Sequence, residues 1–209
     1  FLSREFFMPV VRKIVGAVTP GELTISRSRF AKYIGRDFID VAIYWGCSFL
    51  PRFAHKIPYF GTRAYCWAQI GEIFLGGCLV PATVVDADRG YVAVFSSLSA
   101  DGVQPAPVVK VIAEGLHLVT STPVKNGTTF AAVSTYTATP ESVRRGQWSD
   151  FFPIVVDCFV EDPDDCEDAK RRITKDYWDA LRISLDRLGK LREPGLYEVD
   201  LSDLMFGDD

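Results

Sequence analysis

The amino-acid sequence predicts an α+β fold, in which a small antiparallel β-barrel of about five or six strands lies between one N-terminal helix and one long C-terminal helix. Two observations and one physical argument lead to this prediction. Short runs of β-branched and aromatic residues alternate with turn residues from position 71 onward. Helical apolar spacing comes before and after these runs. Closing the sheet into a barrel of OB- or SH3-like size would remove its exposed edges.

The chain is long enough for one substantial hydrophobic core. It has 209 residues, of which 48% are apolar and 24% charged, close to the globular average. We expect one compact domain with three parts. Residues 1–70 form a helical and aromatic region packed on the barrel, residues 71–162 form the barrel, and residues 163–209 form the C-terminal helix and tail.

The N-terminal helix is expected to begin near Ser28, a favourable N-cap, and to end at Gly46 and Pro51. Residues 51–70 combine Pro, Gly and aromatic side chains and are expected to be a connector packed on the next unit. The apolar positions at helical spacing are Phe30, Ile34, Phe38, Val41 and Trp45.

Strands are expected from Phe74 onward, separated by turns such as DADRG at residues 86–90. A short helical turn or exposed loop is expected at residues 138–148. The expected strands are Phe74–Val85, Tyr91–Leu98, Val108–Ile112, Leu116–Thr120, Thr129–Tyr136 and Phe152–Val160, with an edge strand at Tyr197–Leu201.

The glycines Gly71, Gly76 and Gly77 have part of the spacing of a phosphate-binding loop. Such a loop needs a lysine and a following helix. Cys78 stands where the lysine would be, and the residues after it have the composition of a strand. We therefore interpret Gly76 and Gly77 as a bulge or bend in a strand.

The C-terminal helix has clear boundaries. Asp162 is a favourable N-cap, Pro163 suits the first helical position, and Gly189 suits the end. We expect a single helix of about 26 residues, Pro163–Leu188. The acidic run at residues 161–168 is explained by the helix start, because it lacks the ligand spacing of a calcium loop. No metal site and no cofactor are assigned.

Cysteine and histidine are the residues on which an enzymatic function would depend. The five cysteines are scattered and form no CxxC pair, which predicts reduced thiols and a cytoplasmic location. His55 and His117 belong to no HExxH motif. An enzyme using one of them with a cysteine, or a pocket for a small ligand or lipid, stays open as an alternative. No catalytic residue is assigned.

Arg144, Arg145 and Trp148 are the candidate binding residues. Two arginines and a tryptophan in one loop could stack on a ligand, bind a carboxylate or contact a protein. The alternative is a solvated loop whose tryptophan covers one end of the barrel.

Charge is distributed unevenly along the chain. Residues 1–70 hold 10 Lys and Arg against 4 Asp and Glu, whereas the whole chain has a net charge of −4, which gives no reason to expect nucleic acid. The basic part could contact an anionic membrane surface or the acidic remainder of the chain. No segment is apolar over the 20 residues that a spanning helix needs. The sequence leaves open whether a membrane segment precedes Phe1.

Residues 71–188 also carry a family resemblance. The relevant stretches are LVPATVV (79–85), APVVKVI (106–112), GTTFAAVSTY (127–136), the segment from Trp148 to Pro153, and the acidic-capped helix with Ile173 and Trp178. This pattern resembles an uncharacterised actinobacterial domain-of-unknown-function family of corynebacterial type. The resemblance implies an actinobacterial source and membrane-anchored relatives, and it transfers no activity.

These observations favour a non-catalytic binding or protein-interaction module over an enzyme, with a protein or a small ligand as its partner. A membrane-peripheral accessory protein is the third hypothesis.

Overall fold

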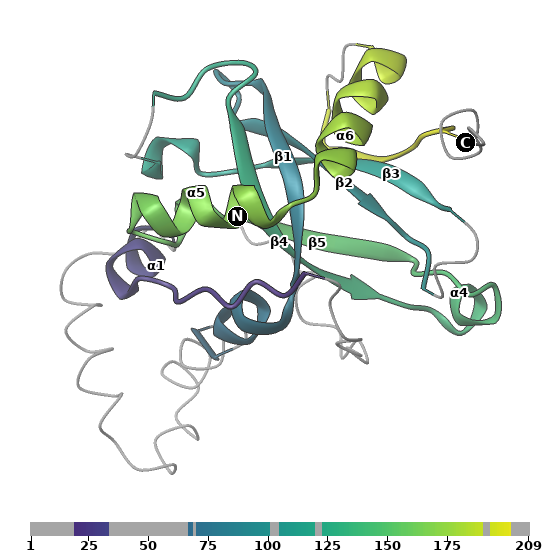
Figure 1. Ribbon diagram of the computed structural model, residues 1–209, viewed down its shortest axis with the longest axis horizontal. Coiled ribbons are helices and arrows are strands. Elements are labelled where there is room, and N and C mark those ends of the chain that lie inside the picture. The colour runs from purple at the N-terminus through teal and green to yellow at the C-terminus, as the bar shows by residue number, and fades with distance from the viewer. Residues whose placement is uncertain are drawn as a thin grey trace, which may run out of the picture.

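The computed structural model describes residues 19–33, 67–68, 70–100, 105–119, 123–189 and 193–201. Among them, six strands form one antiparallel sheet (Figure 1). The strands are β1 (Cys78–Asp86), β2 (Tyr91–Ser97), β3 (Pro107–Ala113), β4 (Thr129–Thr137), β5 (Asp150–Val155) and β6 (Gly195–Glu198). The helices include α1 (Arg27–Tyr33), α4 (Pro140–Arg144), α5 (Pro163–Arg172) and α6 (Lys175–Leu188), with 3₁₀ turns η3 (Leu116–Leu118) and η4 (Val156–Cys158).

The sheet has the strand order β5-β4-β1-β2-β3-β6 and curls into a half-barrel. The predicted α+β class and the number of strands are confirmed, but the predicted closed barrel is wrong. Closure requires a hydrogen-bonded ladder between the first and last strands of the sheet. Among the described strands, β5 pairs only with β4, and β6 pairs only with β3, over four residues.

The half-barrel buries side chains on both faces of its central strands. On the inner face, Ala82 is the register partner of both Val94 and Phe130, and all three are fully buried. On the outer face, Ala93 and Phe95 pack with Leu181 of α6. Burial on both faces explains why β1 and β2 are nearly continuous apolar runs rather than alternating ones.

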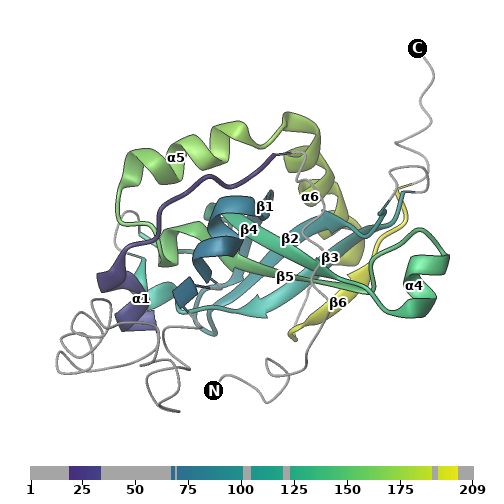
Figure 2. The ribbon, with the colours of Figure 1, turned by 90° about the horizontal axis from the view of Figure 1, so that it is seen from below.

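The C-terminal helix is two helices, not the single one that we predicted. Asp162 and Gly189 cap the ends as expected, but α5 ends at Arg172 and α6 begins at Lys175. Both lie on the same side of the sheet (Figure 2), with α5 over β4 and β1 and α6 over β1, β2 and β3. A straight helix of this length would extend about 39 Å and could not follow the curved sheet. The break lets Ile173 enter the core.

Residues 70–76 are helical, so the strand predicted to begin at Phe74 begins instead at Cys78. Ile70, Ile73 and Phe74 have the spacing of one helical face. The Gly77 N–H donates to the Ile73 carbonyl at 2.7 Å and ends this helix. Gly76 and Gly77 are therefore not a bulge within a strand, although the rejection of a phosphate loop stands because strand, not helix, follows them.

Other boundaries also differ from the sequence-based expectations. The strand expected at Leu116–Thr120 is the 3₁₀ turn η3. The strand expected at Phe152–Val160 is β5, which begins at Asp150 and ends at Val155, before η4. The edge strand near Tyr197 begins at Gly195. α1 begins at Arg27, one residue before the expected cap. The rest of the predicted N-terminal helix and residues 51–66 of the connector lie outside the described residues.

The outward edge of β5 is covered by side chains instead of another strand. The N–H of Phe151 bonds the Asp150 carboxylate at 2.7 Å, and the carbonyl of Phe151 accepts from Lys110 Nζ at 2.7 Å. The N–H of Val155 donates to the carboxylate of Glu114. Pro153, between them, has no N–H. Lys110 lies on β3 and Glu114 directly follows it, so charged side chains connect β3 to β5 along a line that we call the seam.

Gly77 is expected to tolerate no side chain. A Cβ there would lie 2.6 Å from the Ile73 carbonyl oxygen and 2.7 Å from Val133 Cγ1. Gly77→Ala should lower the free energy of unfolding by about 1–3 kcal/mol, measured by urea denaturation. Gly71→Ala is the matched control, because its Cβ would meet nothing within 4 Å and should stabilise the helix by up to about 1 kcal/mol. Equal stabilities of the two variants would contradict this steric interpretation.

Lys110 is expected to contribute to stability through the seam. Lys110→Met removes the partner of both Asp150 and the Phe151 carbonyl, and we expect a loss of about 1–3 kcal/mol in the free energy of unfolding. The exposed edge of β5 should also increase self-association, measured by light scattering. Lys125→Met removes the same charge from an exposed position and should change neither quantity. A Lys110→Met protein that matched this control would show that the seam does not depend on the lysine.

Candidate functional site

Glu114 lies where β3, β5 and α1 meet. The Tyr33 hydroxyl of α1 donates to Glu114 Oε2 at 3.0 Å. The carboxylate also accepts from the backbone N–H groups of Gly115 and Val155. Burial raises the pKa of Glu114 to about 7, although these three neutral donors act to lower it. Glu114 can therefore exchange a proton near neutral pH.

Cys158 and Cys166 are buried thiols near this cluster. Burial, and then the charges of Glu114 and Asp157, raise the pKa of Cys158 far above its ordinary value. Burial also raises the pKa of Cys166 to about 12. A nucleophilic cysteine needs a lowered thiol pKa. Neither residue therefore supports the cysteine–histidine enzyme that the sequence left open.

The histidines add little to that hypothesis. His117 is exposed on η3, although it follows Glu114 by only three residues. His55 lies outside the described residues.

A second polar group lies on the inner face of the half-barrel. Ser96 Oγ and Tyr136 Oη are 2.7 Å apart and share a hydrogen bond. Burial raises the pKa of Tyr136, and the nearby Cys78 raises it further. The phenol is thus neutral, and its ring stacks on Phe151 with centroids 6.1 Å apart. These residues connect β1, β2, β4 and β5 at one end of the half-barrel.

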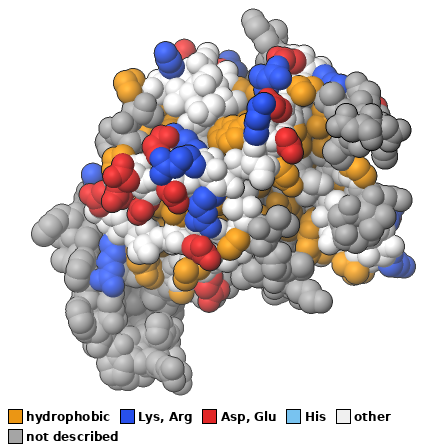
Figure 3. Space-filling view, in the orientation of Figure 1, with side chains coloured by type: hydrophobic (Ala, Val, Ile, Leu, Met, Phe, Trp, Pro, Cys, Tyr) orange, Lys and Arg blue, Asp and Glu red, His pale blue; other side chains and the backbone are white. Residues whose placement is uncertain are grey.

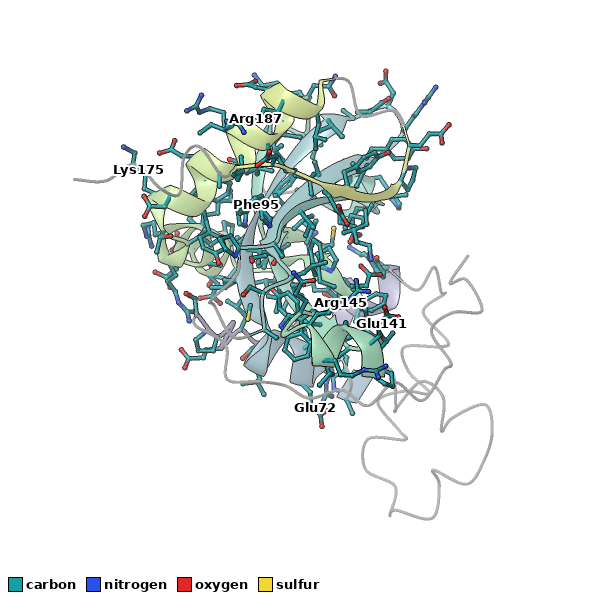
Figure 4. All side chains as sticks on the ribbon, turned by 90° about the vertical axis from the view of Figure 1, so that its right-hand side faces the viewer. Glu72, Phe95, Glu141, Arg145, Lys175 and Arg187 are labelled. Atoms are coloured by element: carbon teal, nitrogen blue, oxygen red, sulfur yellow. The ribbon has the colours of Figure 1, made fainter. Side chains whose placement is uncertain are left out.

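The structure separates the three candidate binding residues. Trp148 is half-buried and packs on Tyr136, with ring centroids 5.8 Å apart, so it covers the end of the half-barrel. Arg144 and Arg145 are exposed on α4. Arg144 Nε donates to the Pro140 carbonyl at 3.2 Å. Arg145 pairs with Glu141 one turn earlier, as Figure 4 shows.

α4 is an ordered helix that contributes no residue to the core. Thr139 and Ser142 form a reciprocal capping box, and Pro140 occupies the first turn. None of its residues is buried, and Val143 is 63% exposed. α4 occupies a corner of the molecule in Figure 1, far from α1 and α5.

The segment that carries α4 is hydrogen-bonded to the residues that follow β2. The N–H of Trp148 donates to the Leu98 carbonyl at 2.7 Å, and the N–H of Ala100 donates to the Gly146 carbonyl at 2.8 Å. The helical turn expected at residues 138–148 is confirmed by α4, and these two hydrogen bonds join its C-terminal side to the chain after β2.

The acidic run before α5 acts as a helix start. The Asp162 side chain accepts from the Asp164 N–H at 2.9 Å, as an N-cap does. The described residues contain no group of His, Cys, Asp and Glu side chains suited to a metal ion. On the face shown in Figure 3, acidic and basic side chains are interspersed over α5 and α6, and several form ion pairs one turn apart, such as Lys170 with Glu167. Such a face is typical of a solvated surface.

Sequence reasoning missed Lys110 and Glu114, the two residues from outside β5 that cover its edge. A signal for them was present. Both lie at alternate positions with Val108 and Ile112, on the face of β3 that should point inward. Charged residues on an inward face need partners, but the sequence does not say that β5 supplies them.

No described helix combines the length and the apolar character that crossing a membrane requires. Comparison with curated proteins gives no match. The chain is similar to the solved structure titled "Crystal structure of a putative membrane protein from Corynebacterium diphtheriae". The identity is 20%, the TM-score is 0.46, and the similarity covers 58% of this chain and 99% of that one.

Residues 66–189 match the family described as "Protein of unknown function (DUF3239)". The resemblance of residues 71–188 to an uncharacterised domain family is thereby confirmed. Because the match spans more than half of the sequence, the chain belongs to the DUF3239 family.

Proposed function

We propose that this domain is a non-catalytic interaction module that contacts its partner through α4. The observation that carries the proposal is the contrast between the order of α4 and its exposure. A five-residue helix with a capping box and an N-terminal proline buries no side chain. Such a helix does little for the core, so its defined shape is better explained by an external contact.

The surface of α4 has the composition of a contact site. Val143 offers exposed aliphatic area, and Arg144 and Arg145 offer two cations beside it. Arginine is enriched at interface positions that dominate binding energy. Because backbone hydrogen bonds join the α4 segment to the residues that follow β2, little conformational entropy would be lost on binding. The two arginines favour a partner with an acidic surface.

The buried polar groups support a non-catalytic role. The raised pKa values of Cys158 and Cys166 keep both thiols protonated, and Tyr136 is bonded to Ser96. Lys110 donates a hydrogen bond to the Phe151 carbonyl in the seam. Each of these groups is engaged in holding the domain together.

A photo-crosslinking residue introduced at Val143 should capture one discrete protein in the native host. The same residue introduced at Lys175, an exposed position on α6 labelled in Figure 4, is the control and should not capture that protein. With the captured protein purified, Arg144→Glu with Arg145→Glu should weaken its Kd by at least about tenfold. Lys175→Glu with Arg182→Glu makes the same charge change on α6 and should leave the Kd unchanged.

Two outcomes would contradict the proposal. One is an identical set of captured proteins at positions 143 and 175. The other is a Kd that the α4 charge reversal does not change. If the wild-type domain instead sedimented with anionic phosphatidylglycerol vesicles at low salt, and the α4 reversal abolished this, the membrane-peripheral hypothesis would replace the protein partner.

A further inference from the structure

α1 is attached to the half-barrel at both of its ends. At the N-terminal end, the Ser26 N–H donates to the Phe159 carbonyl at 2.8 Å, and the hydroxyls of Ser26 and Ser28 donate to Glu161 Oε2. At the C-terminal end, Tyr33 packs on Phe159 with ring centroids 4.4 Å apart and donates to Glu114. Glu114 thus provides a polar contact at this second end.

The two ends differ in their response to pH. The serine hydroxyls, which are the main cause, lower the pKa of the exposed Glu161. Its charged form is therefore favoured by the same two hydrogen bonds that attach this end of α1. Glu114 is half-buried, and the groups that stabilise its charge are Tyr33 and two backbone N–H groups, all of them neutral. Its ionised form is thus the less favourable one in the attached state.

The other titratable or charged groups around this end of α1 can be named. α1 itself carries the buried Arg29 and the exposed Lys32. η4 contributes Asp157 and Cys158, which are both buried. η3 carries His117, whose imidazole is exposed. His117 is the histidine nearest to Glu114 in the sequence, so the test must separate the two residues.

We propose that Glu114 is a protonation-sensitive contact, which holds the C-terminal end of α1 against the half-barrel while it is protonated and weakens that attachment when it is ionised. The geometry supports this, because the half-buried side chain connects Tyr33 of α1 to the Val155 N–H of the seam. Detaching the end of α1 would hydrate the carboxylate and remove the cost of its charge.

The direction of the effect follows from linkage. In the detached state Glu114 loses its proton near its ordinary pKa of 4.5, and in the attached state near a pKa of about 7. Between these values only the attached state holds the proton, so rising pH favours detachment. Below pH 4.5 and above about pH 7, the equilibrium between the attached and detached states no longer depends on pH. Across this window the equilibrium constant for detachment can rise by at most about 300-fold. Because Glu114 is partly exposed, we expect a smaller rise, of about tenfold or more.

Hydrogen–deuterium exchange of the full chain provides the test. After correction for intrinsic exchange, protection of the amides of residues 30–33 should fall by about tenfold or more between pH 5.5 and pH 8. Protection of α6 should stay constant and serves as the internal reference. Glu114→Gln keeps the size of the side chain and cannot ionise, so its α1 protection should be independent of pH. A pH-independent wild type, or an equal slope in Glu114→Gln, would overturn the proposal.

Two further variants separate the titration of Glu114 from the effects of its neighbours. The His117→Gln variant should keep the full pH dependence of α1 protection. If this variant lost the pH dependence, the effect would belong to His117 and not to Glu114. Tyr33→Phe removes the hydroxyl that lowers the pKa of Glu114, so the midpoint of the transition should move to higher pH. A purely structural tyrosine would change the protection of α1 without moving this midpoint. This second variant also keeps the proposal testable if Glu114→Gln does not fold.

Discussion

The free edge of β5 is the constraint on which the rest of the structure depends. An open antiparallel sheet leaves backbone donors and acceptors unpaired along its outer strands, and such edges promote aggregation. Here the edge of β5 is satisfied by Asp150, Lys110 and Glu114, while Pro153 removes one donor. Because Lys110 and Glu114 belong to β3 and the turn after it, β3 must lie close to β5. The sheet therefore curls, although its strands never form the ladder of a closed barrel.

The curl then determines how the helices pack. A curved outer face cannot be covered by one long straight helix, so α5 covers one part of it and α6 the next, with the buried Ile173 at the change of direction. The same curvature brings the turn after β3 beneath α1. Glu114 thus serves two contacts, since it covers an edge donor of β5 and bonds Tyr33 of α1. One carboxyl group therefore both covers the edge of β5 and attaches α1 to the half-barrel.

This arrangement bears on function because three polar side chains of the half-barrel form hydrogen bonds within the domain. Lys110, Tyr136 and Glu114 are bonded to the domain itself, and the thiols of Cys158 and Cys166 are buried and protonated. By contrast, α4 is held in a fixed position without entering the core. A domain built in this way is suited to presenting a surface to a partner. Glu114, whose pKa is raised to about 7, lies where α1 contacts the half-barrel.

The sequence by itself determined the α+β class, most strands and turns, the caps at Asp162 and Gly189, the helical turn that carries Arg144 and Arg145, and the family resemblance, because these depend on local pattern. It also placed Trp148 at the end of the barrel, as one of two alternatives. Local pattern did not reveal the break between α5 and α6, since apolar spacing continues through it. It could not show that the sheet stays open or that Lys110 and Glu114 meet β5 and α1. Those contacts join residues up to 81 positions apart, and only the tertiary structure brings them together.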